Sequence, residues 1–219
     1  MVRKSPPETS TNFDIELHTF RPPPFISIIN QAIEFFTHTP LHPLPPPDKF
    51  AGQGVYGLYY LGNHEAYKRM AEHNRAECNA PIYVGKAVRP GRRKGKTISK
   101  DETQDLFKRL REHTKSLAQA DNLKVEDFRC RFIVLGETEG ELIVPLETEV
   151  IRRSKSLWNM FVDGFGNHDP GKGRYAGRVT EWDVLHPGRA WVGKMTGEKP
   201  SLTNILDKVQ KGLEQSPLF

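Results

Sequence analysis

Apolar residues follow a helical period near the start of the chain. Between proline runs at 22–24 and 45–47, they recur three or four positions apart, at Phe25, Ile28, Ile29, Ala32, Ile33 and Phe36. The pattern predicts an amphipathic helix inside a proline-rich N-terminal arm, residues 1–50. Its apolar stripe must pack either on this chain's own core or on a second copy, and the pattern alone does not choose between them.

Strand patterns begin where the arm ends. The segments GVYGLYYLG from Gly54, PIYVG at 81–85 and FRCRFIVL at 128–135 are rich in β-branched and aromatic residues, and the last alternates as a half-buried strand does. Residues 64–78 suit a helix or a long excursion. Further helices are predicted around Leu106, Leu110 and Leu117, and over 145–156.

This order of elements predicts an α/β fold of the α+β kind, in which a small sheet is flanked by helices. We expect a core over residues 51–160 with an insert at 86–100. From 161 to 219 the chain is glycine-rich and only weakly periodic. We therefore expect a C-terminal extension of long loops laid on a surface, rather than a separate core.

Basic charge is concentrated in the insert. The chain has a net charge of +5, and residues 86–100 hold seven basic side chains and no acidic one, so the remainder nets −2 by subtraction. The members are Lys86, Arg89, Arg92, Arg93, Lys94, Lys96 and Lys100. A solvated loop is one interpretation, and a flexible contact to a polyanion is the other.

Several classes of protein are disfavoured by the sequence. No apolar run approaches the roughly 18 residues that a membrane-spanning helix needs, and no secretion signal is readable, so we expect a cytoplasmic protein without membrane contact. Cys78 and Cys130 are then expected to be reduced thiols, and no metal-binding spacing of cysteine and histidine occurs.

Two tyrosines and a helical pair are candidates for chemistry. Strand alternation places Tyr56 and Tyr83 opposite their apolar neighbours, so the two phenols can share one face. Arg109 and His113 lie one helical turn apart at the edge of an apolar side. The plain alternatives are that the tyrosines are core residues and that Arg109 pairs with Asp105.

A carboxylate stands in an apolar row of the last predicted helix. Ile143 and Ile151 lie four residues on either side of Glu147, and a buried carboxylate requires a cation, a metal ion or hydrogen bonds. Asn159 follows at the end of that helix, where a C-terminal cap is the plain explanation.

Taken in order, GVY, YVG, Arg-x3-His, and a Glu with an Asn twelve residues later resemble the GIY-YIG nuclease family. Valine replaces isoleucine in both name motifs. The phrases FFTHTPLHPLPPPDKF, PIYVGKA, LWNMFVDGFGNHDPG and WDVLHPGR look like the GIY-YIG type II restriction endonucleases that cut the palindrome CCGCGG. With these phrases the resemblance covers nearly the whole chain.

The resemblance implies an enzyme that hydrolyses phosphodiester bonds in double-stranded DNA at a specific palindrome. Glu147 resembles the ligand of a single Mg²⁺, with Mn²⁺ as an alternative, and Arg109 resembles the phosphate clamp. Tyr56 resembles the general base, with His113 as the other possible proton acceptor. Tyr83 then orients the water or the phosphate, and Asn159 holds the site together.

The palindrome implies a homodimer with one active site for each strand, and a companion methyltransferase that protects the host. We expect DNA contacts from the insert and from the C-terminal extension, including Lys172 and Arg174. The alternatives are a DNA-binding module without cleavage and a GIY-YIG homing or repair nuclease. A basic structural domain is the plainest alternative.

Overall fold

The structure is a computed structural model that describes residues 15–20, 23–89, 103–136 and 138–216. Four strands run over His42–Pro43 (β1), Gln53–Tyr60 (β2), Tyr83–Ala87 (β3) and Phe128–Leu135 (β4). The α-helices cover Pro23–His38 (α1), Lys68–Ala76 (α2), Asp105–Leu117 (α3), Ile143–Ser154 (α4), Leu157–Met160 (α5), Glu181–Leu185 (α6) and Leu202–Gln215 (α7). Short 3-10 turns lie at Ile15–His18, Glu65–Tyr67, Val125–Asp127, Glu139–Leu142, Lys172–Arg174 and Val192–Lys194.

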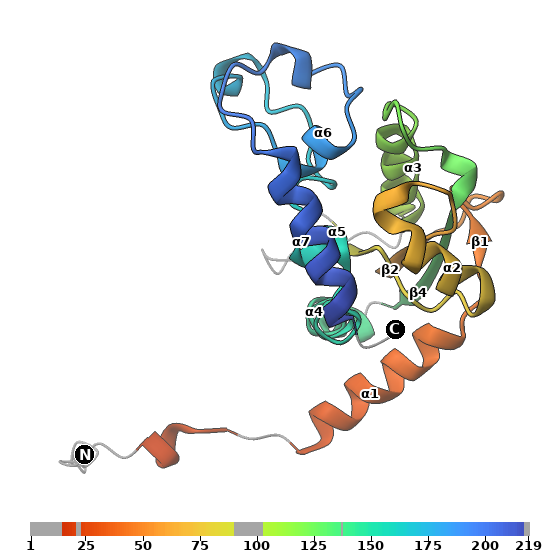
Figure 1. Cartoon of the computed structure of the whole chain (residues 1–219). Helices are drawn as coiled ribbons and strands as arrows, with labels where there is room; N and C mark the ends of the chain where they lie inside the picture. Colours follow the sequence, from red (N-terminus) through yellow and green to blue (C-terminus); the bar gives the residue numbers. More distant parts are fainter. Residues whose placement is uncertain (1–14, 21–22, 90–102, 137, 217–219) are drawn as a thin grey trace, which may run out of the picture.

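The strands form one antiparallel sheet in the order β1-β4-β2-β3, which confirms the expected small α+β sheet. Figure 1 labels three of these strands, β1, β2 and β4. All eight residues of β2 are buried because this central strand has a neighbour on each side and helices on both faces. Its register with β3 places Tyr56 opposite Gly85 and Leu58 opposite Tyr83. Because side chains on one face repeat every second residue, the two tyrosines share a face.

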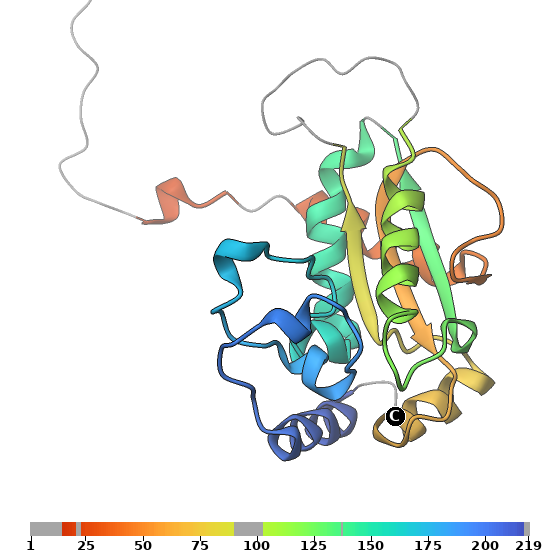
Figure 2. The same ribbon diagram turned by 90° about the horizontal axis from the view of Figure 1, so that it is seen from above.

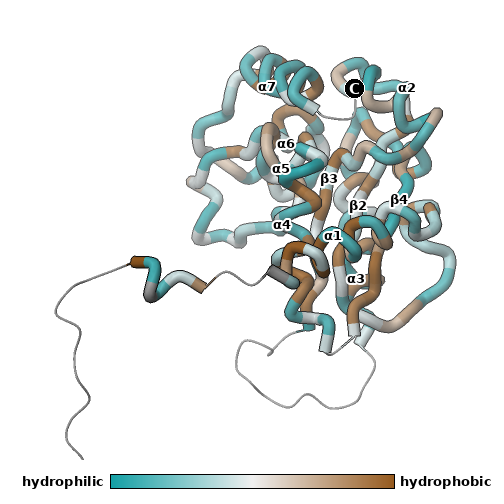
Figure 3. The backbone as a smooth tube through the Cα atoms, turned by 90° about the horizontal axis from the view of Figure 1, so that it is seen from below, coloured by the Kyte–Doolittle hydropathy of each residue, from teal (hydrophilic) through white to brown (hydrophobic). Residues whose placement is uncertain are grey.

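Helices cover both faces of the sheet, as Figure 2 shows for α3 in front of β2. One face packs on α2, α3 and the C-terminal segment, and the other packs on α1 and α4. The strands form the brown, hydrophobic centre of Figure 3. None of the helices within the described ranges is both long and apolar enough to cross a bilayer.

The N-terminal helix α1 docks on the chain's own core, against α4 and β4. Ile29 and Phe36 are only 5% and 1% exposed, so this part of the predicted stripe has a partner within the chain, whereas Phe25 and Ile28 of the same stripe remain 41% and 44% exposed. Ile26 and Phe35 on the remaining side are 67% and 62% exposed.

The C-terminal segment corrects one expectation. Residues from 161 onward were expected to lie as loops on a surface, yet Phe165 and Trp182 are among the most buried side chains, at 1% and 0% exposure. They belong to the same hydrophobic cluster as the sheet face that carries Tyr56. The chain therefore brings loops with little regular structure into the core, because their large aromatic residues bury apolar area without a repeating pattern.

Candidate functional site

The two tyrosines lie side by side on adjacent strands, as strand alternation predicts. Their ring centroids are 6.3 Å apart, and Tyr56 is fully buried while Tyr83 is partly exposed. Gly85, opposite Tyr56 in the sheet, leaves the space into which that phenol extends, since a Cβ at this position would stand 2.4 Å from the Tyr56 hydroxyl oxygen.

Helix α3 supplies an imidazole to the same point. The Tyr56 hydroxyl lies 2.5 Å from Nε2 of His113, and the histidine is only 2% exposed. The His113 ring stacks on Phe165 with centroids 4.7 Å apart and meets the Tyr83 ring edge-on at 5.2 Å. A phenol and an imidazole are thus held in one closed aromatic cage.

Burial determines the protonation of this pair. It raises the pKa of Tyr56 well above 10; Tyr83 and Glu147 also raise it, while Arg109 lowers it only partly. Burial lowers the pKa of His113 well below 6.5, helped by Arg109 and by His168. Both groups are therefore neutral near pH 7, with the phenol donating and Nε2 accepting. For Tyr56, the lowering of the pKa by Arg109 is therefore outweighed by burial.

Arg109 stands beside the phenols and is held by the C-terminal segment. Its Nη1 donates to Glu112 Oε2 at 2.8 Å and to His168 Nε2 at 2.9 Å, and its Nη2 donates to the Gly166 carbonyl oxygen at 3.3 Å. The alternative partner, Asp105, instead accepts from Thr103 Oγ1. The Arg109 side chain remains 24% exposed, so it can be reached from solvent.

Gly166 and His168 were not predicted as site residues. A Cβ at Gly166 would stand 3.0 Å from the Tyr83 hydroxyl and 3.3 Å from Nη2 of Arg109, so this position is in close contact with both. The only signal in the sequence was their place in the phrase GFGNHDPG.

Glu147 is partnered by a cation, as its place in an apolar row required. Its Oε2 accepts a hydrogen bond from Nζ of Lys86, and the two side chains are 14% and 34% exposed. Glu147 also raises the pKa of Tyr56 and Tyr83, so it lies within electrostatic reach of both phenols. Lys86, which was predicted to contact DNA, is thus placed with the carboxylate.

Among the described residues, no three His, Cys, Asp or Glu side chains gather as a metal cluster. A lone carboxylate nevertheless fits a magnesium ion, since Mg²⁺ keeps several waters and often takes one or two carboxylates together with substrate phosphates. Glu147 is the carboxylate that could serve here.

Asn159 corrects the expectation of a helix cap. It lies on the separate helix α5, after α4 has ended in a left-handed residue, Lys155. Its Nδ2 donates to the Val84 carbonyl oxygen and its Oδ1 accepts from the Val84 amide, both at 2.8 Å. Ser156 Oγ adds a third hydrogen bond at 2.7 Å. The amide therefore ties α5 to β3 beside Tyr83.

The remaining basic candidates are spread out. Arg89 donates from Nε to Thr103 Oγ1 at 3.1 Å. Lys172 and Arg174 are exposed on a 3-10 turn of the C-terminal segment. Arg92, Arg93, Lys94 and Lys96 lie outside the described residues.

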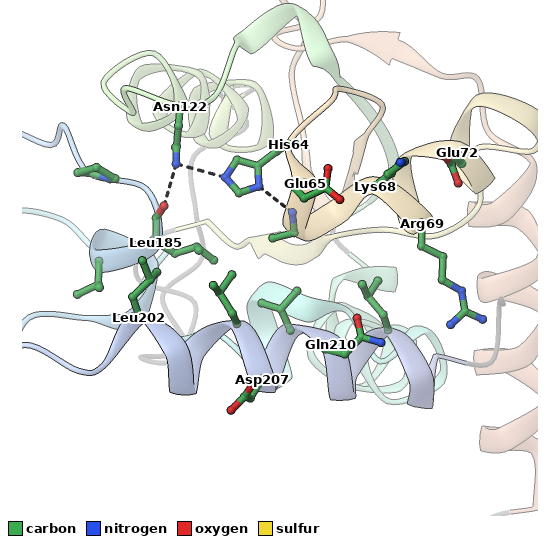
Figure 4. A pocket seen from close by; sticks show the side chains of 16 residues that line it. His64, Glu65, Lys68, Arg69, Glu72, Asn122, Leu185, Leu202, Asp207 and Gln210 are labelled. Atoms are coloured by element: carbon green, nitrogen blue, oxygen red, sulfur yellow. Dashed lines mark hydrogen bonds between the residues drawn. The ribbon is translucent and has the colours of Figure 1, made fainter.

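A separate groove lies between α7 and the segment from His64 to Glu72 (Figure 4). It encloses about 910 Å³, and its floor is apolar. Its charged rim has two basic side chains, Lys68 and Arg69, against the three acidic Glu65, Glu72 and Asp207. This balance of charge does not favour binding of a polyanion, so we do not assign DNA binding to the groove.

One family of known proteins matches most of the chain. Residues 48–213 match the family described as the Eco29kI GIY-YIG domain, which is more than half of the chain. No match to a curated protein is found. The matched range includes all six residues that the motifs singled out: Tyr56, Tyr83, Arg109, His113, Glu147 and Asn159.

Proposed function

Because the chain belongs to the Eco29kI GIY-YIG family of restriction endonucleases, which implies hydrolysis of DNA phosphodiester bonds, we propose that it is a metal-dependent, site-specific endonuclease with its active site at Tyr56 and His113. The observation that carries this assignment of the site is the 2.5 Å hydrogen bond between a buried phenol and a buried imidazole, beside an arginine side chain that is 24% exposed.

Arg109 binds the scissile phosphate. Its planar fork can donate to two phosphate oxygens at once, which an ammonium cannot do. In the free protein Glu112, His168 and the Gly166 carbonyl engage three of its five N–H donors, so the side chain is oriented before DNA arrives. Preorganised donors need little rearrangement when charge develops on the phosphate.

GIY-YIG nucleases generally use a divalent metal ion, and Glu147 is the proposed ligand. When bound, Mg²⁺ or Mn²⁺ supplies charge neutralisation at the phosphate and at the departing 3′ oxygen. Lys86 neutralises the carboxylate in the free protein and becomes available to a DNA phosphate when Glu147 takes another partner.

Tyr56 and His113 move the proton. The attacking water gives a proton to the Tyr56 oxygen while the phenol proton passes to Nε2 of His113 across the existing hydrogen bond. Nε2 is unprotonated near neutral pH because burial lowers the histidine pKa. The relay avoids a free phenolate, which burial makes costly. Tyr83 orients the water or the phosphate at the rim of the site.

The proposed target is the palindrome CCGCGG, read by a homodimer that places one site on each strand. Guanine-rich sites are commonly read by Arg or Lys donors in the major groove. We assign this contact to the basic residues of the 86–100 insert and to Lys172 and Arg174. The exposed Ile26 and Phe35 on α1 are candidates for the dimer contact. The proposal includes a cytoplasmic location and a companion methyltransferase.

The decisive experiment compares Glu147→Gln with Glu149→Gln on plasmid DNA in Mg²⁺. Glu149 lies on the same helix but is paired with Arg152 and Arg153, so it controls for the loss of one acid from α4. We expect defined fragments from the wild type and from Glu149→Gln, and none from Glu147→Gln, with DNA binding retained by all three. A wild type that binds DNA without cutting it refutes the endonuclease proposal and favours a binding module.

A further inference from the structure

A buried arginine outside the proposed site binds the backbone of a loop that contacts that site. Arg189 is 3% exposed and donates to three backbone carbonyls, those of Gly164 at 3.0 Å, Phe165 at 3.3 Å and Asn167 at 3.1 Å. Residues 164–168 are called the clamp loop below. Three carbonyls of one short loop thus converge on a single guanidinium.

The charge of Arg189 is fully compensated in place. Its Nε donates to Asp183 Oδ1 at 2.5 Å, and both side chains of this ion pair are 1% exposed. The guanidinium also lies over two indoles, 4.6 Å from the ring centroid of Trp182 and 4.9 Å from that of Trp191. A buried ion is tolerated only when it is paired and hydrogen-bonded, and here Asp183, the carbonyls and the rings meet that requirement.

The clamp loop reaches the proposed site at three points. Phe165 stacks on His113, the Gly166 carbonyl accepts from Arg109, and His168 accepts from Arg109. The same loop therefore covers the proton acceptor and holds the phosphate clamp. Within the loop, the Asn167 amide donates to the Gly164 carbonyl at 3.2 Å.

We propose that Arg189 is a positioning residue for phosphodiester hydrolysis. It fixes the clamp loop, and through the loop it fixes Arg109 and His113, without touching substrate. This inference rests on the proposed function. Lysine cannot replace Arg189, because one ammonium can pair with Asp183 but cannot also present a planar fork to three carbonyls.

The test compares Arg189→Lys with Tyr67→Phe. Tyr67 is buried in the same cluster, and its hydroxyl joins Trp158 Nε1 and His186 Nε2, at 2.9 and 2.7 Å. Its removal weakens the packing of this part of the molecule while every hydrogen bond of the clamp loop remains. Three quantities are measured in each variant: amide hydrogen exchange of the clamp loop, DNA affinity without divalent metal, and the single-turnover cleavage rate with Mg²⁺ at saturating enzyme.

We expect Arg189→Lys to exchange the clamp-loop amides faster and to cleave about 100-fold more slowly, the loss typical of a catalytic group displaced by about 1 Å. DNA affinity should stay within about twofold, since most of the affinity comes from other phosphate contacts. Tyr67→Phe should keep both the loop protection and the cleavage rate. Should Arg189→Lys fail to fold, Asp183→Asn takes its place. This variant keeps an oxygen that accepts from Arg189 but removes the negative charge, and we expect it to speed clamp-loop exchange and slow cleavage less than Arg189→Lys does, with DNA affinity unchanged.

A cleaving wild type together with an Arg189→Lys variant that cleaves equally fast overturns this inference and leaves the proposed function intact. An equal loss of cleavage in Tyr67→Phe also overturns it, because the effect would then follow from packing alone. A wild type that cuts no DNA overturns the proposed function, and the inference with it.

Discussion

The hydrogen bond between Tyr56 and His113 allows a direct test of the proton relay. Tyr56→Phe keeps the ring and deletes the hydroxyl, whereas His113→Gln offers an amide oxygen that can accept the same hydrogen bond but cannot take up a proton. Because both wild-type groups are buried, with exposures of 0% and 2%, Tyr56→Phe leaves Nε2 unpaired and should cost about 1–2 kcal/mol of stability. His113→Gln should cost less.

Cleavage should respond differently from stability. Loss of a general base typically slows a reaction by roughly 10²–10⁴-fold, and we expect each single variant to fall in that range. If the two groups act as one relay, the double variant should be no slower than the slower single variant. Single-turnover cleavage with saturating enzyme measures the rates, and urea unfolding measures the stabilities.

Multiplying effects in the double variant would refute the relay and show that the two groups act independently. A His113→Gln enzyme that cuts at the wild-type rate would assign the histidine to orientation alone. DNA affinity without metal provides the control, since neither variant should change it by more than about twofold while phosphate contacts dominate binding.

Three further predictions concern the surroundings of this pair. Asn159→Ala should lose about 2 kcal/mol of stability in urea unfolding, because two hydrogen bonds to the backbone of β3 disappear. Unchanged stability would contradict a stabilising role for these two hydrogen bonds. Stability should be constant between about pH 6.5 and 8 and should fall below pH 6.5, by about 1.4 kcal/mol per pH unit for each of His113 and His186. Stability falls in this direction because burial lowers the pKa of both histidines, so the unfolded chain binds protons that the folded chain does not. Urea unfolding at pH 7.5, 6 and 5 measures this loss, and a stability that does not change with pH would contradict the prediction. Gly166→Ala should slow cleavage about tenfold or more in a single-turnover assay while keeping DNA affinity, because its Cβ would stand 3.3 Å from Nη2 of Arg109, and a wild-type rate would show that the contact is unimportant.

Local patterns predicted much of the sheet and some of the contacts among the candidate side chains. Alternation in two strands was enough to put Tyr56 and Tyr83 on one face, and the register confirms it. The apolar row around Glu147 required a partner for its carboxylate, and Lys86 provides one. These predictions succeeded because each depended on a period within a single element.

Contacts between distant segments could not be predicted in this way. Arg189 reaches carbonyls more than twenty residues earlier in the chain, and no period connects the two. Trp182 and Phe165 are buried from a glycine-rich region that gave no helical or strand signal. Helix α7 is different, since Ile205, Val209 and Leu213 repeat every four residues and could have been identified from the sequence.

The hydrogen bonds between Asn159 and Val84 also affect association between chains. Strand β3 has a sheet neighbour only on its β2 side, so its outer backbone would offer unpaired groups to another chain. The side-chain amide of Asn159 instead hydrogen-bonds both the N–H and the carbonyl of Val84, and the backbone N–H of Trp158 donates to the Ile82 carbonyl nearby, at 2.9 Å. One short helix thus blocks extension of the sheet into a neighbouring molecule, and a chain altered there should be watched for self-association as closely as for lost cleavage.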